Sequence, residues 1–199
     1  MKSPLVAGVA GAGLLIAACQ TSTGGIATVS SGAASSPATT TSTALAGVSP
    51  PTAAAPNPKV TGTTFDGCAS VTDAEATSWG LDLSSKRTTA DDNAVGADSV
   101  RGCVWDGDKW QVRAYAVNGS MTEWGRPSPD FDRKEQVQFG SRQGWLAHGA
   151  RIPDCTAVVA SEHGLAGVQV IPRRALQLDH TDVCPITQQI MTTIVSRIP

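Results

Sequence analysis

The sequence has 199 residues, with 15 Lys and Arg against 17 Asp and Glu, so its formal net charge at pH 7 is −2. This balance argues against binding to nucleic acid, which needs a surface rich in Lys and Arg to neutralise phosphates. Residues 63–199 have the length of one domain, and a chain of that size can bury a substantial hydrophobic core.

The first 18 residues have the pattern of a bacterial signal peptide. Lys2 is the only charged residue before Cys19, and most of the intervening residues are apolar. The apolar stretch is shorter than the ~20 residues that a membrane-spanning helix needs, and it has the length of a signal-peptide core. It ends in Ile16-Ala17-Ala18-Cys19, which resembles the lipobox of bacterial lipoproteins. We therefore predict a signal peptide over residues 1–18 and cleavage before Cys19.

Lipidation of Cys19 predicts a membrane anchor made of a diacylglycerol and an acyl chain such as palmitate. Each buried methylene contributes ~0.8 kcal/mol, so two or three chains hold a protein firmly on a membrane. The alternative is an ordinary secretory signal that a cysteine happens to follow. The position of Cys19, where an apolar run changes into a polar segment, favours the lipobox. The mature protein is then secreted and lipid-anchored at the extracytoplasmic face of the cell membrane, in the cell envelope.

Residues 19–62 are predicted to form the lipid anchor and a disordered tether. Residues 20–58 contain no Asp, Glu, Lys, Arg or His, and are mainly Ser, Thr, Ala, Gly and Pro. Such a segment cannot bury enough apolar surface to offset the entropy of the chain. The threonines near Pro37 also suit O-linked sugars, with a bare polar linker as the alternative.

Five cysteines are present, and Cys19 is assigned to the lipid. The remaining four, an even number in an oxidising compartment, indicate two disulfides, for which three pairings are possible. We predict Cys68–Cys103 and Cys155–Cys184, because sequential pairing ties the first helix to a hairpin and the last helix to a late strand. A four-thiolate zinc site is disfavoured because no Cys-x-x-Cys occurs, and no cofactor or metal is predicted.

The first predicted element is a helix over residues 68–81. Thr72 and Glu75 have the spacing of a capping box, and Gly80 is a stop signal. A shared apolar face is expected for Val71, Ala74, Ser78 and Trp79. Residues 86–99 are polar and are predicted to form a loop.

Three pairs of strands follow. Alternating side chains and turn residues predict strands at 100–105 and 110–117 around the turn Asp106-Gly107-Asp108. Residues 118–132 contain Gly and Pro and are expected to form a loop. Further strand pairs are predicted at 135–139 with 144–148 and at 156–161 with 166–171, the last pair joined by the turn 162–164.

The chain ends in a predicted amphipathic helix. Asp182 suits its N-cap and Pro185 its first turn, while Ile186, Ile190 and Ile194 recur at helical spacing. The layout predicts an α+β domain over residues 63–199. Its sheet is mostly antiparallel, with an N-terminal and a C-terminal helix packed on it, and two disulfides staple it.

The cysteines and their neighbours resemble a known group of proteins. A Cys at an N-terminal helix (Cys68) is followed by Cys103-Val104-Trp105, by Cys155, and by Cys184-Pro185 before a terminal helix. With the lipobox and the tether, this pattern resembles the actinobacterial, chiefly mycobacterial, envelope lipoproteins of the Lpr/Lpp type, over about residues 65–199. Those proteins carry a C-terminal domain of unknown function. The resemblance implies an envelope location and disulfides, and it brings no catalytic residues.

Catalytic chemistry has weak support. The sequence lacks the Gly-x-Ser-x-Gly elbow of many serine hydrolases. His148, His163 and His180 are the only imidazoles, and surface or capping roles suit them better than catalysis. The paired carboxylates at 91–92 and at Asp106 and Asp108 are explained by loops and turns, although a calcium site at the latter pair is an alternative. No catalytic residue is predicted.

The five tryptophans favour binding. Trp79, Trp105 and Trp145 are predicted to lie in the core, whereas Trp110 follows a turn and Trp124 lies in a Gly/Pro-rich loop. Exposed Trp beside charge is typical of binding hot spots, so Trp110, Trp124 and Arg126 are the candidate ligand-binding residues. The alternative is that these rings pack against their own loops.

The resulting functional hypothesis is a non-enzymatic module that binds an unknown envelope protein or a cell-wall or lipid ligand such as a glycolipid. The alternatives are a hydrolase of envelope polymers or lipids, and a lipid carrier, which needs a long apolar cavity.

The anchor is directly testable. Cys19→Ala should move the protein from the detergent phase to the aqueous phase in a two-phase partition, because the acyl chains lose their attachment site. Identical partitioning of the two forms would show that Cys19 is not the anchor.

Overall fold

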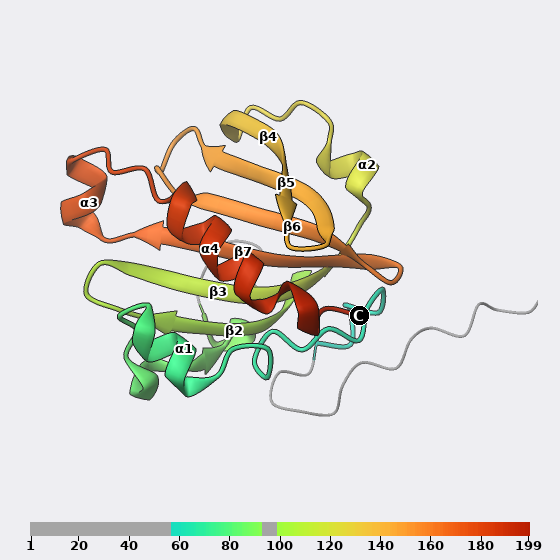
Figure 1. Ribbon diagram of the computed structural model, residues 1–199, viewed down its shortest axis with the longest axis horizontal. Coiled ribbons are helices and arrows are strands. Elements are labelled where there is room, and N and C mark those ends of the chain that lie inside the picture. Colours follow the sequence, from blue (N-terminus) through green and yellow to red (C-terminus); the bar gives the residue numbers. More distant parts are fainter. Residues whose placement is uncertain (1–56, 93–98) are drawn as a thin grey trace, which may run out of the picture. The chain divides into compact units, whose positions relative to one another are not determined.

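The computed structural model describes residues 57–92 and 99–199. In this part of the chain the strands form one seven-stranded antiparallel sheet, in the order β1-β2-β3-β7-β6-β5-β4 (Figure 1). The predicted signal peptide, Cys19 and residues 20–56 of the predicted tether lie outside the described residues. None of the helices within 57–92 and 99–199 has the length and apolar character needed to cross a membrane.

The strands are β1 Arg87–Thr88, β2 Val100–Asp106, β3 Trp110–Asn118, β4 Phe131–Phe139, β5 Arg142–Gly149, β6 Cys155–Ser161 and β7 Gly164–Pro172. The helices are α1 Asp73–Ser78, α2 Met121–Trp124, α3 Arg174–Leu178 and α4 Cys184–Ile194, with short 3-10 turns η1 Leu83–Ser85, η2 Thr89–Asp91 and η4 Val195–Arg197.

The sheet consists of two meanders that meet at β3 and β7. One meander is β1-β2-β3 and the other is β4-β5-β6-β7, and β3 pairs with β7 over nine positions from Trp110↔Pro172 to Asn118↔Gly164. Strand β4, which follows β3 in the chain, lies at the far edge of the sheet. The connection of residues 119–130 therefore has to pass several strands before β4 begins.

Helix α4 covers one face of the sheet, which we call the core face, and Figure 1 shows it lying across the strands. Ile190, Met191 and Ile194 are fully buried there against β-strand residues such as Val112 and Val168. Complete burial of such a side chain contributes ~1.5–3 kcal/mol. The predicted α+β class with a mainly antiparallel sheet is confirmed, and the isoleucine repeat identified α4 correctly.

The start of the domain is fastened by a buried arginine. The Arg101 side chain, on β2, is almost inaccessible and donates hydrogen bonds to the carbonyls of Val60 (2.8 Å), Thr63 (2.6 Å) and Phe65 (3.0 Å). A guanidinium is buried at low cost only when its N–H groups find acceptors. Asn57 and Val60, which precede the predicted domain start at residue 63, therefore also pack on the sheet.

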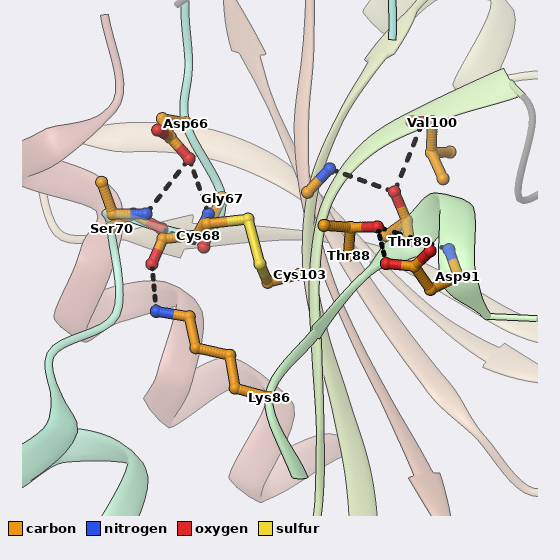
Figure 2. The surroundings of a disulfide bond; sticks show 12 residues. Asp66, Gly67, Cys68, Ser70, Lys86, Thr88, Thr89, Asp91, Val100 and Cys103 are labelled. Carbon is orange, nitrogen blue, oxygen red and sulfur yellow. Dashed lines mark hydrogen bonds between the residues drawn. A yellow bond between two sulfur atoms is a disulfide. The ribbon is translucent and has the colours of Figure 1, made fainter. Parts of the chain in front are cut away.

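Both predicted disulfides are present. Cys68 and Cys103 have a Cα–Cα distance of 4.8 Å, and Cys155 and Cys184 one of 5.1 Å. Figure 2 shows the first bond joining the turn at Cys68 to β2, with Lys86 Nζ donating to the Cys68 carbonyl (3.1 Å). All four sulfurs are thus oxidised, which excludes the alternative of a zinc site built from their thiolates.

Helix α1 is shorter than the predicted helix over residues 68–81. Its capping box of Thr72 and Glu75 is confirmed, and Gly80 ends it with a φ of 73°. Cys68 lies in a turn before the helix, because Asp66 Oδ1 accepts the N–H groups of Cys68 and Ala69 and holds the chain out of helical geometry. The buried side chains are consequently Val71, Ala76 and Trp79, while Ala74 and Ser78 are exposed.

Further differences concern the connecting segments and the position of Trp145. Strand β4 begins at Phe131, within the predicted loop, and α2 forms a single turn in the same loop. Helix α3 was not predicted. Trp145 was expected in the core, but its cross-strand partner is Val158 rather than Val159. Since side chains alternate between faces and Val159 belongs to the core cluster, Trp145 lies on the opposite face of the sheet.

The disulfides should carry a large part of the stability. The double substitution Cys68→Ala/Cys103→Ala opens a loop with a sequence separation of 35 residues, and should lower the free energy of unfolding by about 3–4 kcal/mol on the chain-entropy account. Urea unfolding measures the loss. A peptide map of the non-reduced protein that links Cys68 to Cys155 or Cys184 would contradict the pairing.

Acid should weaken the contact between α1 and the C-terminus. Arg197 donates to both carboxylate oxygens of Glu75 (2.7 and 2.8 Å), and this hydrogen bonding lowers the pKa of Glu75 to about 2. A lowered pKa stabilises the fold above the unfolded value of 4.5, and this stabilisation is lost as the pH falls through about 2.

Glu75→Gln should therefore cost up to about 1 kcal/mol at pH 7, because the pair is partly exposed to solvent, and the cost should shrink between pH 4.5 and 2. The control is Glu135→Gln, which removes an exposed carboxylate on β4. A pH-independent difference between Glu75→Gln and wild type in urea unfolding would contradict the assignment.

Candidate ligand-binding groove beside helix α2

Helix α2 is a single turn fixed at both ends. Ser120 and Glu123 form a capping box, in which the Ser120 hydroxyl accepts the N–H of Glu123 and the Glu123 carboxylate accepts the N–H of Ser120. At the other end, Gly125 packs on Trp145, and a Cβ atom at position 125 would lie 3.2 Å from Trp145 Cζ2. The glycine therefore lets the loop backbone approach the indole closely.

Lys134, on β4, fastens the loop that follows α2. Its Nζ donates to the carbonyl of Trp124 (2.6 Å) and to the carbonyl of Arg126. The same ammonium lies 5.9 Å from the ring centroids of Trp124 and Trp145, and 5.5 Å from that of Phe131. Each cation–π contact contributes ~0.5–1 kcal/mol or more when shielded from water. The half-buried Lys134 is thus a cation held by carbonyls and rings, and it orders the backbone around it.

Two hollows flank this loop, and together they form what we call the α2 groove. The larger, of about 650 Å³, is lined by Met121, Gln136, Gln143 and Trp145 among others. The smaller, of about 290 Å³, is lined by Trp124, Phe131 and Lys134 among others. Arg126 and Pro127 line both hollows. Volumes of this order fit small ligands or segments of a longer one.

The structure brings two of the three predicted binding residues together. Trp124 and Arg126 both line the α2 groove, where Trp124 packs on Phe131 with ring centroids 5.4 Å apart. Trp110 lies elsewhere, in a hollow of about 370 Å³ beside Trp79, and its Nε1 donates to the Trp79 carbonyl (3.0 Å).

Trp110 starts β3, whereas the connection to α2 leaves from the other end of that strand. Nine extended residues put these ends about 25 Å apart. The turn at 106–109 and the loop at 118–132 therefore do not come together in one hollow, and the binding role of Trp110, Trp124 and Arg126 stays a prediction. Trp110 would belong to a separate site.

Several groove residues were not identified from the sequence, namely Lys134, Gln136, Gln143 and Trp145. Lys134 fell between the predicted loop of residues 118–132 and the predicted strand of residues 135–139, and Trp145 was assigned to the core. The alternation along residues 144–148 could have identified Trp145. Leu146 is buried on the core face, so its neighbour Trp145 must point to the other face.

Over residues 14–197 the chain matches the family described as "Protein of unknown function (DUF3558)". The chain belongs to the DUF3558 family. It matches no curated protein and no solved structure. The family description names no activity, so the function of this DUF3558 protein has to be argued from its own residues.

The histidines of the DUF3558 domain do not assemble a hydrolytic site around a reactive sulfur. His148 Nδ1 lies 2.7 Å from Asp132 Oδ1, which is the arrangement of a base and its orienting acid. Its cross-strand partner, however, is Cys155, whose sulfur is in a disulfide. His163 and His180 are exposed, in a turn and in a loop.

Two of the acidic residues singled out in the sequence, Asp92 and Asp106, are engaged in ion pairs. Asp106 is bonded to Arg87 (2.7 Å), Gln111 (2.9 Å) and Arg173 (2.7 Å). Burial pushes the pKa of Asp106 upwards, but the hydrogen bonds from Gln111 and Arg87 outweigh it and hold the pKa below its usual value. Within residues 57–92 and 99–199, no cluster of three or more His, Cys, Asp or Glu side chains is arranged to hold a metal ion.

The same polar network continues on the sheet face opposite α4, because Arg87 also donates to Asp92 (3.2 Å). Arg113 bonds to Asp92 (2.7 Å) and to Gln169 (3.1 Å), and Gln169 donates to Asp154 (2.6 Å). Burial raises the pKa of Asp154, and the hydrogen bond from Gln169 opposes the rise. These contacts link β3, β7 and two loops, although Arg113 Nε is buried without a hydrogen-bond partner in the described part of the chain, and we assign the network a structural role in the DUF3558 fold.

The role of Lys134 can be measured. Lys134→Met keeps the length and apolar stem of the side chain and removes its hydrogen bonds, so the loop around Trp124 and Arg126 should open more readily. Loss of two hydrogen bonds, at about 0.5–1.5 kcal/mol each, should speed amide hydrogen exchange in residues 121–127 about tenfold or more, with β6 unchanged. Lys109→Met, which removes an exposed lysine beside Trp110, is the control. Equal exchange in both variants would remove Lys134 from this role.

Proposed function

We propose that this protein is a membrane-anchored lipoprotein of the cell envelope, of the actinobacterial type, and that its domain is a non-enzymatic module that binds an envelope ligand in the α2 groove. The lipobox at Cys19 and the tether-like composition of residues 20–58 support the location. A tether of the composition of residues 20–58 would let a domain search the space above the membrane for its ligand.

The observation that carries the binding role is the ordering of the groove. Lys134 and the Ser120–Glu123 capping box hold the loop in place, so little conformational freedom has to be lost when a ligand binds. Such preorganisation favours affinity. Trp145 and Arg126 both line the groove at the surface. Aromatic and Arg side chains of this kind dominate binding hot spots.

The two alternative functions have less support. A hydrolase would need a nucleophile beside a base, and the sulfur opposite His148 is oxidised. A lipid carrier would need a long apolar cavity between the sheet and α4. That space is filled by core side chains, including Val168, Ile190 and Ile194, none of which has exposed surface.

The proposal is tested by capture of envelope material on the full-length lipidated protein in detergent, with bound protein, sugar and lipid each assayed. Trp124→Ala removes an aromatic wall of the groove, and should reduce capture by tenfold or more if the ring is an anchor worth about 2 kcal/mol. Thr122→Trp should do the same by obstruction, because Thr122 is exposed and lines the larger hollow. Its melting temperature should stay unchanged.

The matched control is Trp110→Ala, which alters the separate hollow beside Trp79. Undiminished capture by folded Trp124→Ala and Thr122→Trp would show that the α2 groove is not the binding site. Loss of capture in Trp110→Ala alone would place the site at the hollow beside Trp79.

A further inference from the structure

We infer that the ligand of the α2 groove is an acidic glycan, a sugar chain that carries carboxylates. The inference rests on the proposed function and names the ligand class for the same site. Three features of the larger hollow support it: a pair of amides, an apolar wall and a single free cation.

The amides belong to Gln136 on β4 and Gln143 on β5. Gln143 Nε2 donates to Gln136 Oε1 at 3.3 Å, and both side chains are exposed and line the hollow. A side-chain amide has one carbonyl acceptor and two N–H donors. After one bond between them, the pair still offers a donor group and an acceptor side by side. Neighbouring sugar hydroxyls, each of which both donates and accepts, complement this arrangement.

The wall is formed by Trp145, with Met121 and Pro127 on the loop side. Trp145 is partly exposed, and directly opposite Gln136 across the strands. An aromatic ring beside hydrogen-bonding groups suits a ligand with both apolar and polar surface. A sugar ring has this character, because its C–H groups can pack on the indole while its hydroxyls reach the amides.

The charge of the hollow is positive. Among residues 57–92 and 99–199, Arg126 is the only ionisable residue that lines it, and no carboxylate from these residues does so. Arg126 is exposed, and within the described part of the chain its guanidinium makes no hydrogen bond or ion pair, although its backbone is fixed by Lys134. By contrast, Arg133 nearby is paired with Asp182 at 2.8 Å. A free guanidinium on an ordered backbone is suited to bind a carboxylate in a two-pronged contact.

The shape favours a chain over a single small molecule. The larger hollow is open and adjoins the smaller one through Arg126 and Pro127, which line both. In the smaller hollow the Glu123 carboxylate is engaged by Ser120 and the Lys134 ammonium by two carbonyls. An acidic peptide would use Arg126 but has no need of the paired amides, and a lipid tail would not use any of the polar groups.

The experiment measures binding to the full lipidated chain in detergent micelles by calorimetry. The probes are tetragalacturonate, which is an acidic sugar chain, maltotetraose, which is a neutral chain with the same type of linkage, and a tetraglutamate peptide. Wild type should bind tetragalacturonate at least tenfold more tightly than either other probe. Higher salt should weaken this preference, because the contact with Arg126 is exposed.

Two sets of variants separate the contributions. Arg126→Glu should remove the preference for the acidic sugar, whereas Arg174→Glu, the same charge change on α3 at the other end of the sheet (Figure 1), should leave it intact. The double variant Gln136→Met/Gln143→Met should weaken both sugars and leave the melting temperature unchanged, since both side chains are exposed.

Equal affinity for the acidic and neutral sugars, equal effects of Arg126→Glu and Arg174→Glu, or peptide binding as tight as tetragalacturonate binding would each overturn the inference. If no sugar binds while capture of envelope material still depends on Trp124 and Thr122, the ligand class is wrong and the proposed function stands. If capture does not depend on these residues either, both fail.

Discussion

The pairing of β3 with β7 determines how the rest of the domain is arranged. It joins the two meanders over nine residue pairs, and it places β4, the next strand in the chain, at the opposite edge of the sheet. Residues 119–130 must therefore travel from the middle of the sheet to its edge. Helix α4 already covers the core face, so this connection lies against the other face, where Gly125 meets Trp145. The α2 groove is thus a consequence of the strand order.

A connection that crosses a sheet exposes backbone groups that need partners. Lys134 supplies such a partner here by donating to two backbone carbonyls, those of Trp124 and Arg126. Arg101 does the same for the segment that enters the domain, with three carbonyl acceptors. In both places a cation from a strand orders an irregular segment. The difference lies in what remains exposed. Among the described residues the guanidinium of Arg126 has no hydrogen-bond partner, whereas Val60, Thr63 and Phe65, which Arg101 holds, are buried.

Much of the fold could be predicted because its signals are local. Pro185 and the isoleucine repeat indicated α4, the Asp-Gly-Asp turn indicated the β2–β3 hairpin, and the cysteine order indicated both disulfides. Strand β4 was only half found, since an edge strand is exposed on most sides and shows no clear alternation. The groove depends on contacts between β4, β5 and the loop. These contacts join residues that are distant in the sequence, so no local pattern predicts that Lys134 lies among three aromatic rings. Trp124 and Arg126 could be singled out because a Trp and an Arg in a Gly/Pro-rich loop suggest binding. Trp145 could be assigned to the groove face only from the pairing register of β5.

The five tryptophans offer a direct test, because each indole N–H gives its own signal in a nitrogen–proton correlation spectrum. Trp79 and Trp105 are buried, Trp110 lies at the separate hollow, and Trp124 and Trp145 line the groove. On titration of the full-length protein with soluble envelope extract, the account predicts that the indole signals of Trp124 and Trp145 shift while the other three stay in place. A shift confined to Trp110, or no indole shift when envelope material binds, would contradict it.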